Sequence, residues 1–206
     1  MKDPLKERRE VKTRQTPWAQ SLACFLLRKG VRPNDISLAS MLFAVLAGVF
    51  LFLRIYLGAA LCIQLRLLCN MLDGMLAIEG KAATKTGEVF NELPDRVSDS
   101  VILISAGSAA LSPYAWLGWI AAFFALSTAY IRLLGYSVTG KMYFNGPLAK
   151  PQRMFVLTLG CLLAPVFAFW TQDAWVITIA LIFITAGSLI TCLRRLIFII
   201  KELEAK

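Results

Sequence analysis

Five amide and carboxyl side chains lie in two consecutive apolar stretches, where a membrane helix would ordinarily carry none. Asn70 and Asp73 stand near the end of one stretch, and Asn91, Asp95 and Asp99 lie in the next. Lipid hydrocarbon penalises such groups, so they require a water-filled cavity, polar partners or a cation. Oxygen ligands of this kind suit a hard divalent cation, and a carboxylate can also accept a proton during catalysis. We therefore expect the five side chains to form one functional site.

The spacing of these residues places them on shared helix faces. Asn70 and Asp73 are three residues apart, which puts them about 60° and about 4.5 Å apart on a helix. Asn91, Asp95 and Asp99 recur at every fourth position and form a stripe along one face of the following helix. The connector between the two helices is short and polar. We therefore expect antiparallel neighbours whose polar faces meet about two turns below the membrane surface.

Residue types elsewhere in the chain limit which catalytic groups and metal ligands are available. The sequence contains no histidine, so the usual zinc ligand and general base is absent and catalysis would rely on carboxylates. Its five cysteines lie in or beside apolar stretches, without the spacing of a disulfide or metal framework. We interpret them as small buried hydrophobic residues.

The elements that must position the site are membrane helices. Hydrophobic residues make up 58% of the 206 residues, more than a soluble domain of this size carries. Six stretches approach the roughly 20 apolar residues that a membrane crossing needs. They cover residues 36–54, 56–78, 87–111, 114–136, 154–171 and 175–193. We therefore expect an all-α integral membrane protein, with six transmembrane helices in one domain over residues 31–200.

The segments that flank this domain are polar or amphipathic. Residues 1–15 are expected to form a charged cytoplasmic tail, and residues 201–206 a second one. Thr16 and Pro17 are typical of a helix cap followed by proline at the first helical position. The segment 16–30 is amphipathic and too short to cross a bilayer. It predicts a helix on the cytoplasmic membrane surface, without a catalytic role.

The net charge of +9 follows the pattern of a membrane protein. Lysines and arginines concentrate in the two tails and in alternate loops of the six-helix arrangement, as the positive-inside rule requires. We expect both termini in the cytoplasm, a bacterial inner membrane as the location, and membrane lipids as neighbours of the basic residues. No groove-reading motif accompanies the charge, so nucleic acid is not an expected partner.

The polar residues belong to a longer pattern. Asn70–Ile78 reads NMLDGMLAI and, after eight intervening residues, Gly87–Asp95 reads GEVFNELPD. This pattern resembles the signature of the CDP-alcohol phosphatidyltransferase family, D-x2-D-G-x2-A-R-x8-G-x3-D-x3-D, and matches its spacing throughout. Three residue types depart from the signature, because Asn70 and Asn91 replace aspartates and Ile78 replaces an arginine. The six-helix layout and the preceding surface helix are also similar to the family.

The resemblance implies transfer of a phosphatidyl group from CDP-diacylglycerol to an alcohol acceptor, with release of CMP, in phospholipid biosynthesis. It also implies a homodimer and a divalent cation, Mg²⁺ or alternatively Mn²⁺. Asp73, with Asn70 and Asn91, would hold this metal. Because two anionic ligands are missing, we expect one ion, or a second ion that binds only together with substrate phosphates.

Other site roles follow from the same resemblance. Asp95 would be the catalytic base that takes the proton of the acceptor hydroxyl. The positions that would line the nucleotide site are Gly74, Ala77 and Gly87.

Basic residues near the fourth and fifth spans are candidates for the acceptor site. In relatives, basic residues in this region bind the phosphate of a phosphorylated acceptor. This implies an acceptor-binding role for Lys150, Arg153 and Arg132, with glycerol 3-phosphate or inositol phosphate as suitable acceptors. Topology alone also places basic residues at a cytoplasmic helix end, so the role stays open.

Asp99 lies beyond the end of the signature. Counting the helical rise from the connector places Asp99 and Arg66 at the same depth, about 19 Å along their helices. We favour a buried ion pair between them. The alternative, in which Asp99 supplies the charge that Asn91 lacks, stays open.

Two other functions are compatible with the same residues. A catalytically inactive CDP-lipid-binding protein on this fold would explain the residue changes at Asn70, Asn91 and Ile78. A transporter would use Asp73, Asp95 and Asp99 as ion sites, but the sequence lacks the internal repeats typical of transporters.

Overall fold

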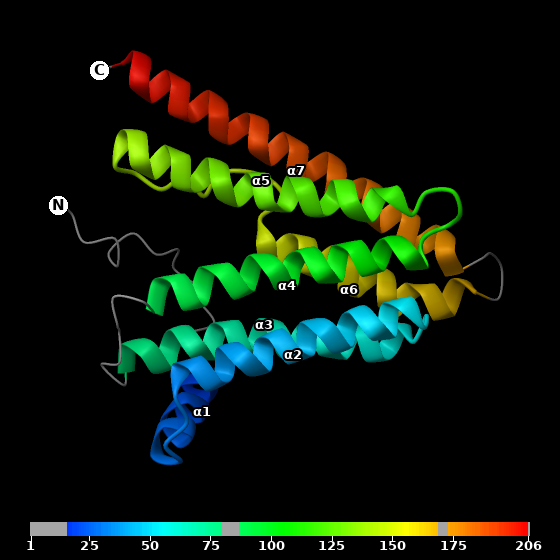
Figure 1. Cartoon of the computed structure of the whole chain (residues 1–206), viewed down its shortest axis with the longest axis horizontal. Coiled ribbons are helices and arrows are strands. Elements are labelled where there is room, and N and C mark those ends of the chain that lie inside the picture. The colour runs from blue at the N-terminus through cyan, green and yellow to red at the C-terminus, as the bar shows by residue number, and fades with distance from the viewer. Residues whose placement is uncertain (1–15, 80–86, 169–172, 206) are drawn as a thin grey trace.

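The computed structural model describes residues 16–79, 87–168 and 173–205, and for residues 77–79 and 87–91 it describes the backbone alone. Seven α-helices make up the described part of the chain. They are α1 (Pro17–Arg28), α2 (Pro33–Phe52), α3 (Tyr56–Glu79), α4 (Gly87–Ala109), α5 (Trp116–Thr139), α6 (Lys150–Phe167) and α7 (Asp173–Glu204). In Figure 1, α2 to α7 run side by side along the long axis of the molecule, whereas α1 lies across one end.

Length and apolar composition qualify four of these helices to cross a membrane, namely α2, α3, α5 and α7. Large apolar side chains such as Leu42, Trp119 and Phe183 are exposed on the outside of the bundle, as expected where a protein meets lipid. The chain is therefore an all-α membrane protein, as predicted. The predicted spans in α4 and α6 are not among these four helices. α4 carries several charged residues, and α6 has only 18 residues with two basic side chains in its first turn.

Some helix bounds differ from the sequence-based prediction. α6 begins at Lys150 instead of residue 154, and α7 extends to Glu204, through most of the predicted C-terminal tail. Glu202 ties this extension of α7 to the loop before α6. Its carboxylate accepts hydrogen bonds from Lys141 Nζ and Tyr143 Oη, both at 2.6 Å. These contacts favour a helical end that hydropathy alone did not predict.

The connector between α5 and α6 is clamped against α7. The backbone N–H of Leu148 donates to Thr191 Oγ1 at 3.1 Å, and Arg195 Nε donates to the carbonyl oxygen of Asn145 at 3.0 Å. Gly146 has a φ of 135°, and a Cβ there would overlap the Thr191 side chain, so this close approach requires glycine. The clamp sets where α6 begins, and α6 starts part-way along α4 in Figure 1.

Small residues bring α4 and α5 into backbone contact. A Cβ on Gly118 would lie 2.6 Å from the carbonyl oxygen of Leu103, and a Cβ on Gly107 would overlap the carbonyl oxygen of Ala115. Small side chains are what allow membrane helices to approach this closely. The position of α4, which carries Asp95 and Asp99, is therefore set by glycine contacts deeper in the bundle.

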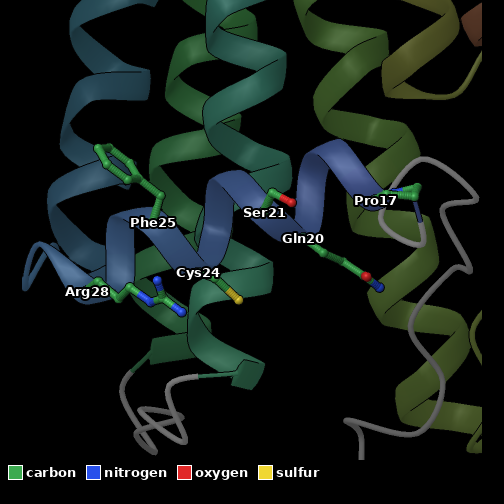
Figure 2. Close-up of a pocket in the computed structure, with 6 residues that line it drawn as sticks. All are labelled: Pro17, Gln20, Ser21, Cys24, Phe25 and Arg28. Carbon is green, nitrogen blue, oxygen red and sulfur yellow. The ribbon is translucent and has the colours of Figure 1, made fainter.

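The short helix α1 packs on the C-terminal half of α3. Its Ala19 and Ala23 are buried in a cluster with Leu72, Met75 and Leu76. The hollow in Figure 2 lies along α1 and is lined by Pro17, Gln20, Ser21, Cys24, Phe25 and Arg28. α1 thus braces the helix that carries Asn70 and Asp73.

Candidate functional site

The signature residues lie where α3 ends and α4 begins, at one end of the bundle (Figure 1). The two helices run antiparallel, as predicted, but among the described residues they are not a closely packed pair. α2 packs against both of them instead. The Arg66 side chain of α3 reaches α4, where it pairs with Asp95 and Asp99. In the described part of the chain, the polar faces of the two helices meet through these ion pairs of Arg66.

Asn70 and Asp73 face α2. Ser40 Oγ donates to Asn70 Oδ1 at 2.6 Å, and Ser37 Oγ donates to Asp73 Oδ2 at 3.1 Å. The two serines repeat the three-residue spacing of their partners on the preceding helix. That matched spacing is the signal that could have predicted them, and our sequence analysis missed it. The serines hold one oxygen of each partner in a fixed direction.

The second carboxylate oxygen of Asp73 remains available. Asp73 Oδ1 is buried and has no hydrogen-bond partner within the described part of the chain. Asp73 as a whole is 4% exposed. Asp95 and Lys150 both lie within electrostatic range of this carboxyl group. A buried, unpartnered carboxylate oxygen next to an asparagine is the kind of donor that a hard cation uses.

Asp95 has a cation at each carboxylate oxygen. Lys150 Nζ lies 2.5 Å from Oδ2, and Arg66 Nη2 lies 3.5 Å from Oδ1. Arg66 Nη2 also donates to the backbone carbonyl oxygen of Asp95 at 3.2 Å. The predicted base is therefore held in an ion-pair network, and one predicted acceptor residue, Lys150, contacts it directly.

Asp99 forms the predicted pair with Arg66 in this structure. Arg66 Nη2 lies 2.7 Å from Asp99 Oδ1, and Arg153 Nη2 lies 3.6 Å from Oδ2. Arg153 is 1% exposed and also donates to Thr128 Oγ1 and to the carbonyl oxygen of Leu148. Arg153 was an acceptor candidate, but its guanidinium lies in the core, where it balances the charge of Asp99.

The third acceptor candidate, Arg132, belongs to a separate cluster. Its Nη2 lies 3.0 Å from both carboxylate oxygens of Glu92, which also pairs with Arg96. The ring of Phe144, from the α5–α6 connector, lies 5.8 Å from the Arg132 guanidinium. The role of Glu92 was not anticipated, although its four-residue spacing from Arg96 is a recognisable helix pair.

Some predicted site positions lie outside the side chains that the structure describes. These are Asn91, Ala77 and Gly87. Gly74 is described, and it is buried in α3 directly after Asp73. In the described ranges, no three histidine, cysteine, aspartate or glutamate side chains are grouped so that they could hold a metal. Two oxygen donors of α3 lie at this position, namely the unpartnered Oδ1 of Asp73 and the Oδ1 of Asn70, which accepts from Ser40 Oγ.

Known proteins resemble the chain over most of its length. No family model matches it. Inner membrane protein YnbA of Escherichia coli is 28% identical over 152 residues, covering 72% of this chain and 75% of that protein. The phosphatidylinositol phosphate synthase of Mycolicibacterium smegmatis is 25% identical over 186 residues, covering 82% of this chain and 78% of the synthase.

Solved structures show the same architecture. The phosphatidylinositol phosphate synthase of Mycobacterium tuberculosis with CDP-DAG bound matches with a TM-score of 0.74 at 21% identity, covering 88% of this chain and 92% of the other. The structure of that synthase with manganese and citrate also has a TM-score of 0.74 and covers 88% of each chain. The chain thus shares the fold of the Mycobacterium tuberculosis synthase.

Proposed function

We propose that this chain is a CDP-alcohol phosphatidyltransferase, which transfers the phosphatidyl group of CDP-diacylglycerol to an alcohol and releases CMP. The observation that carries the proposal is the free, buried oxygen of Asp73 within electrostatic range of Asp95 on another helix. The signature spacing of these residues supports it. So do the relatives that are phosphatidylinositol phosphate synthases.

Asp73 and Asn70 present oxygen atoms from one face of α3, and Asn91 joins this set through the family resemblance. We assign these three residues to one divalent cation, Mg²⁺ or Mn²⁺. When bound, such an ion neutralises pyrophosphate charge and polarises the phosphorus. The nucleotide-binding role that the resemblance implies falls on Gly74, Ala77 and Gly87.

Asp95 is assigned as the base. The acceptor hydroxyl gives its proton to the Asp95 carboxylate while its oxygen attacks the phosphorus that bears diacylglycerol. The new phosphorus–oxygen bond replaces the bond to the bridging pyrophosphate oxygen, which leaves with CMP. Asp95 must first exchange one ionic contact for the hydroxyl. The flexible stem of Lys150 makes that contact the easier one to open, since Arg66 is also held by Asp99.

The proposed acceptor is a small alcohol or alcohol phosphate that binds beside the α5–α6 connector. Of the three basic candidates, Arg132 is the best placed, because Lys150 and Arg153 face Asp95 and Asp99. The Arg132 side chain keeps 18% of its surface exposed. An acceptor phosphate would compete with the Glu92 carboxylate for this guanidinium.

We also propose that α2 to α7 all cross a bacterial inner membrane, with both termini in the cytoplasm, and that α1 lies on the membrane surface. The 23 residues of α4 are long enough to cross. Its Asp95 and Asp99 have ionic partners inside the bundle, and pairing is what permits charges at membrane depth. The exposed Trp18 and Phe25 of α1 support its surface position. A homodimer follows from the family resemblance.

The test is CMP release from CDP-diacylglycerol by the purified full-length protein with Mg²⁺ and a panel of alcohols and alcohol phosphates. Mass spectrometry of the lipid product identifies the acceptor. Formation of CMP together with a new phospholipid supports the proposal, and no CMP release with any acceptor overturns it. CDP-diacylglycerol binding without turnover would instead identify a CDP-lipid-binding protein. Two features favour that second candidate, namely the asparagines at positions 70 and 91 and the cations at both oxygens of Asp95.

A further inference from the structure

The position of Lys150 in the site is fixed by the surrounding structure. It is the first residue of α6, and its side chain is only 19% exposed. The connector that leads to it is clamped to α7 through Thr191 and Arg195. Arg153, one turn further along α6, donates to the carbonyl oxygen of Leu148 and also holds this segment. Three separate hydrogen bonds therefore fix the chain segment that places the Lys150 ammonium group beside Asp95.

The charges of the described site balance without any metal. The carboxylates of Asp73, Asp95 and Asp99 are matched by the cations of Arg66, Lys150 and Arg153. Among the described side chains, however, the ion pairs of these three cations go to Asp95 and Asp99. Asp73 accepts a hydrogen bond from the Ser37 hydroxyl at Oδ2, and its Oδ1 has no hydrogen-bond partner among the described residues. The network thus makes its direct ionic contacts to Asp95 and Asp99 and leaves Asp73 Oδ1 without a direct partner, open to an external cation.

This balance limits how many divalent ions the site can hold. One divalent ion adds two positive charges, which match the two negative charges of a pyrophosphate diester. A second ion at Asp95 would have to lie close to the ammonium of Lys150 and the guanidinium of Arg66. Like charges at such short range repel strongly inside a protein. The amides at positions 70 and 91 carry no negative charge that could offset this repulsion.

We propose that Lys150 is an internal counter-cation that closes Asp95 to divalent metal, so that the site binds a single divalent ion at Asp73 and Asn70. Lys150 then carries out at Asp95 the charge compensation that a further metal ion would otherwise provide. The inference concerns the cation site of the proposed enzyme, so it rests on that function for its purpose. Its test does not use the nucleotide lipid or turnover.

The experiment counts Mn²⁺ ions bound by the full-length protein in lipid nanodiscs, by electron paramagnetic resonance titration with Mn²⁺ as the probe. The wild type should bind one Mn²⁺ per chain. Lys150→Met, which keeps an unbranched apolar side chain but removes the ammonium charge, should bind a second ion or bind the first at least about tenfold more tightly. Lys150→Arg retains the charge and should behave like the wild type.

The control variant is Lys141→Met, which removes a lysine from the pair with Glu202, away from Asp95. It should leave the Mn²⁺ count and affinity unchanged. Two bound ions in the wild type, or a Lys150→Met protein with wild-type count and affinity, would overturn the proposal. These results would leave the phosphatidyltransferase assignment intact, whereas absence of CMP release would overturn that assignment without changing the ion count.

A double variant guards against misfolding of Lys150→Met. Asp95→Asn combined with Lys150→Met removes both charges of the pair and leaves neither one buried alone. Since Asp95 is not a metal ligand in the proposal, the double variant should still bind one Mn²⁺ with wild-type affinity. A loss of affinity of about tenfold or more would show that Asp95 ligates the ion and would refute the inference.

Discussion

Arg66 Nη2 lies 2.7 Å from Asp99 Oδ1, and both side chains are shielded almost completely from the surroundings. The same guanidinium donates to the backbone carbonyl oxygen of Asp95 and lies 3.5 Å from its carboxylate. One side chain of α3 therefore joins the base position to the buried acid one helical turn below it. Because the described parts of α3 and α4 are not closely packed, this guanidinium is a main link between the two helices that carry the signature.

The first prediction concerns the stability provided by this link. Asp99→Asn leaves the Arg66 guanidinium buried without its nearest carboxylate. Removing one partner of a buried pair costs about 3–5 kcal/mol, and we expect a loss of that order in the free energy of unfolding. Denaturant titration in mixed micelles measures it. Adding Arg66→Met should recover part of the loss, because the unpaired charge is then removed.

The exposed pair of Arg54 and Asp173 supplies the control for this stability measurement. Its side chains are 49% and 25% exposed, and exposed pairs contribute about 0–1 kcal/mol. Arg54→Met should therefore change the free energy of unfolding little. An Asp99→Asn protein as stable as the wild type would show that the buried pair does not hold α3 and α4 together.

The second prediction concerns Asp73 as the carboxylate that remains for a cation. Asp73→Asn keeps the shape of the side chain and its acceptor oxygen for Ser37, but removes the charge. Mn²⁺ affinity should fall by about a hundredfold or more, since even changes in groups that only support a ligand cost about 10–100-fold. Asp35→Asn is the matched control, because the Asp35 carboxylate only accepts a hydrogen bond from the backbone of Arg32. Unchanged affinity in Asp73→Asn would remove the proposed ion from α3.

The third prediction separates catalysis from binding at Asp95. Asp95→Asn should lower the rate of CMP release by about 10²–10⁴-fold, the usual contribution of a general base. CDP-diacylglycerol binding, followed by thermal stabilisation of the protein, should persist because the metal-holding residues are unchanged. Normal turnover in this variant would assign the base to another residue.

The fourth prediction concerns the serines of α2. Ser40→Ala removes the hydrogen bond that holds Asn70 Oδ1 and leaves its amide group free to rotate. We expect about a tenfold loss of Mn²⁺ affinity, as is typical when a group that orients a metal ligand is removed. Ser127→Ala is the control, since the exposed Ser127 hydroxyl bonds only to the carbonyl oxygen of Phe123 on its own helix. Equal affinities in the two variants would show that Ser40 does not position Asn70.

Much of the architecture follows from local sequence patterns. Apolar stretches with charged ends predicted the helical membrane bundle, and Thr16-Pro17 predicted the start of α1. These predictions succeed because burying backbone hydrogen bonds in lipid leaves the helix as the spanning element. The bounds of α6 and α7 were less accurate, because contacts of Glu202 and the α5–α6 connector extend helices beyond their apolar segments.

The sequence by itself determined which residues could carry chemistry. Helical periodicity placed Asn70 with Asp73 and Asp95 with Asp99, and the equal depth of Arg66 and Asp99 predicted their ion pair. Both results depend only on the regular rise and rotation of a helix, which a linear sequence contains.

Only the tertiary structure decided which charges remain available at the site. Lys150 and Asp95 are brought together by the way the α5–α6 connector is clamped to α7, and Ser37 meets Asp73 because α2 packs against α3. No sequence spacing encodes these distances, since they depend on how three separate helices pack. The sequence supplied the acidic and basic residues of the site. Helix packing determined that two cations lie at the Asp95 carboxylate while one oxygen of Asp73 has no partner among the described residues.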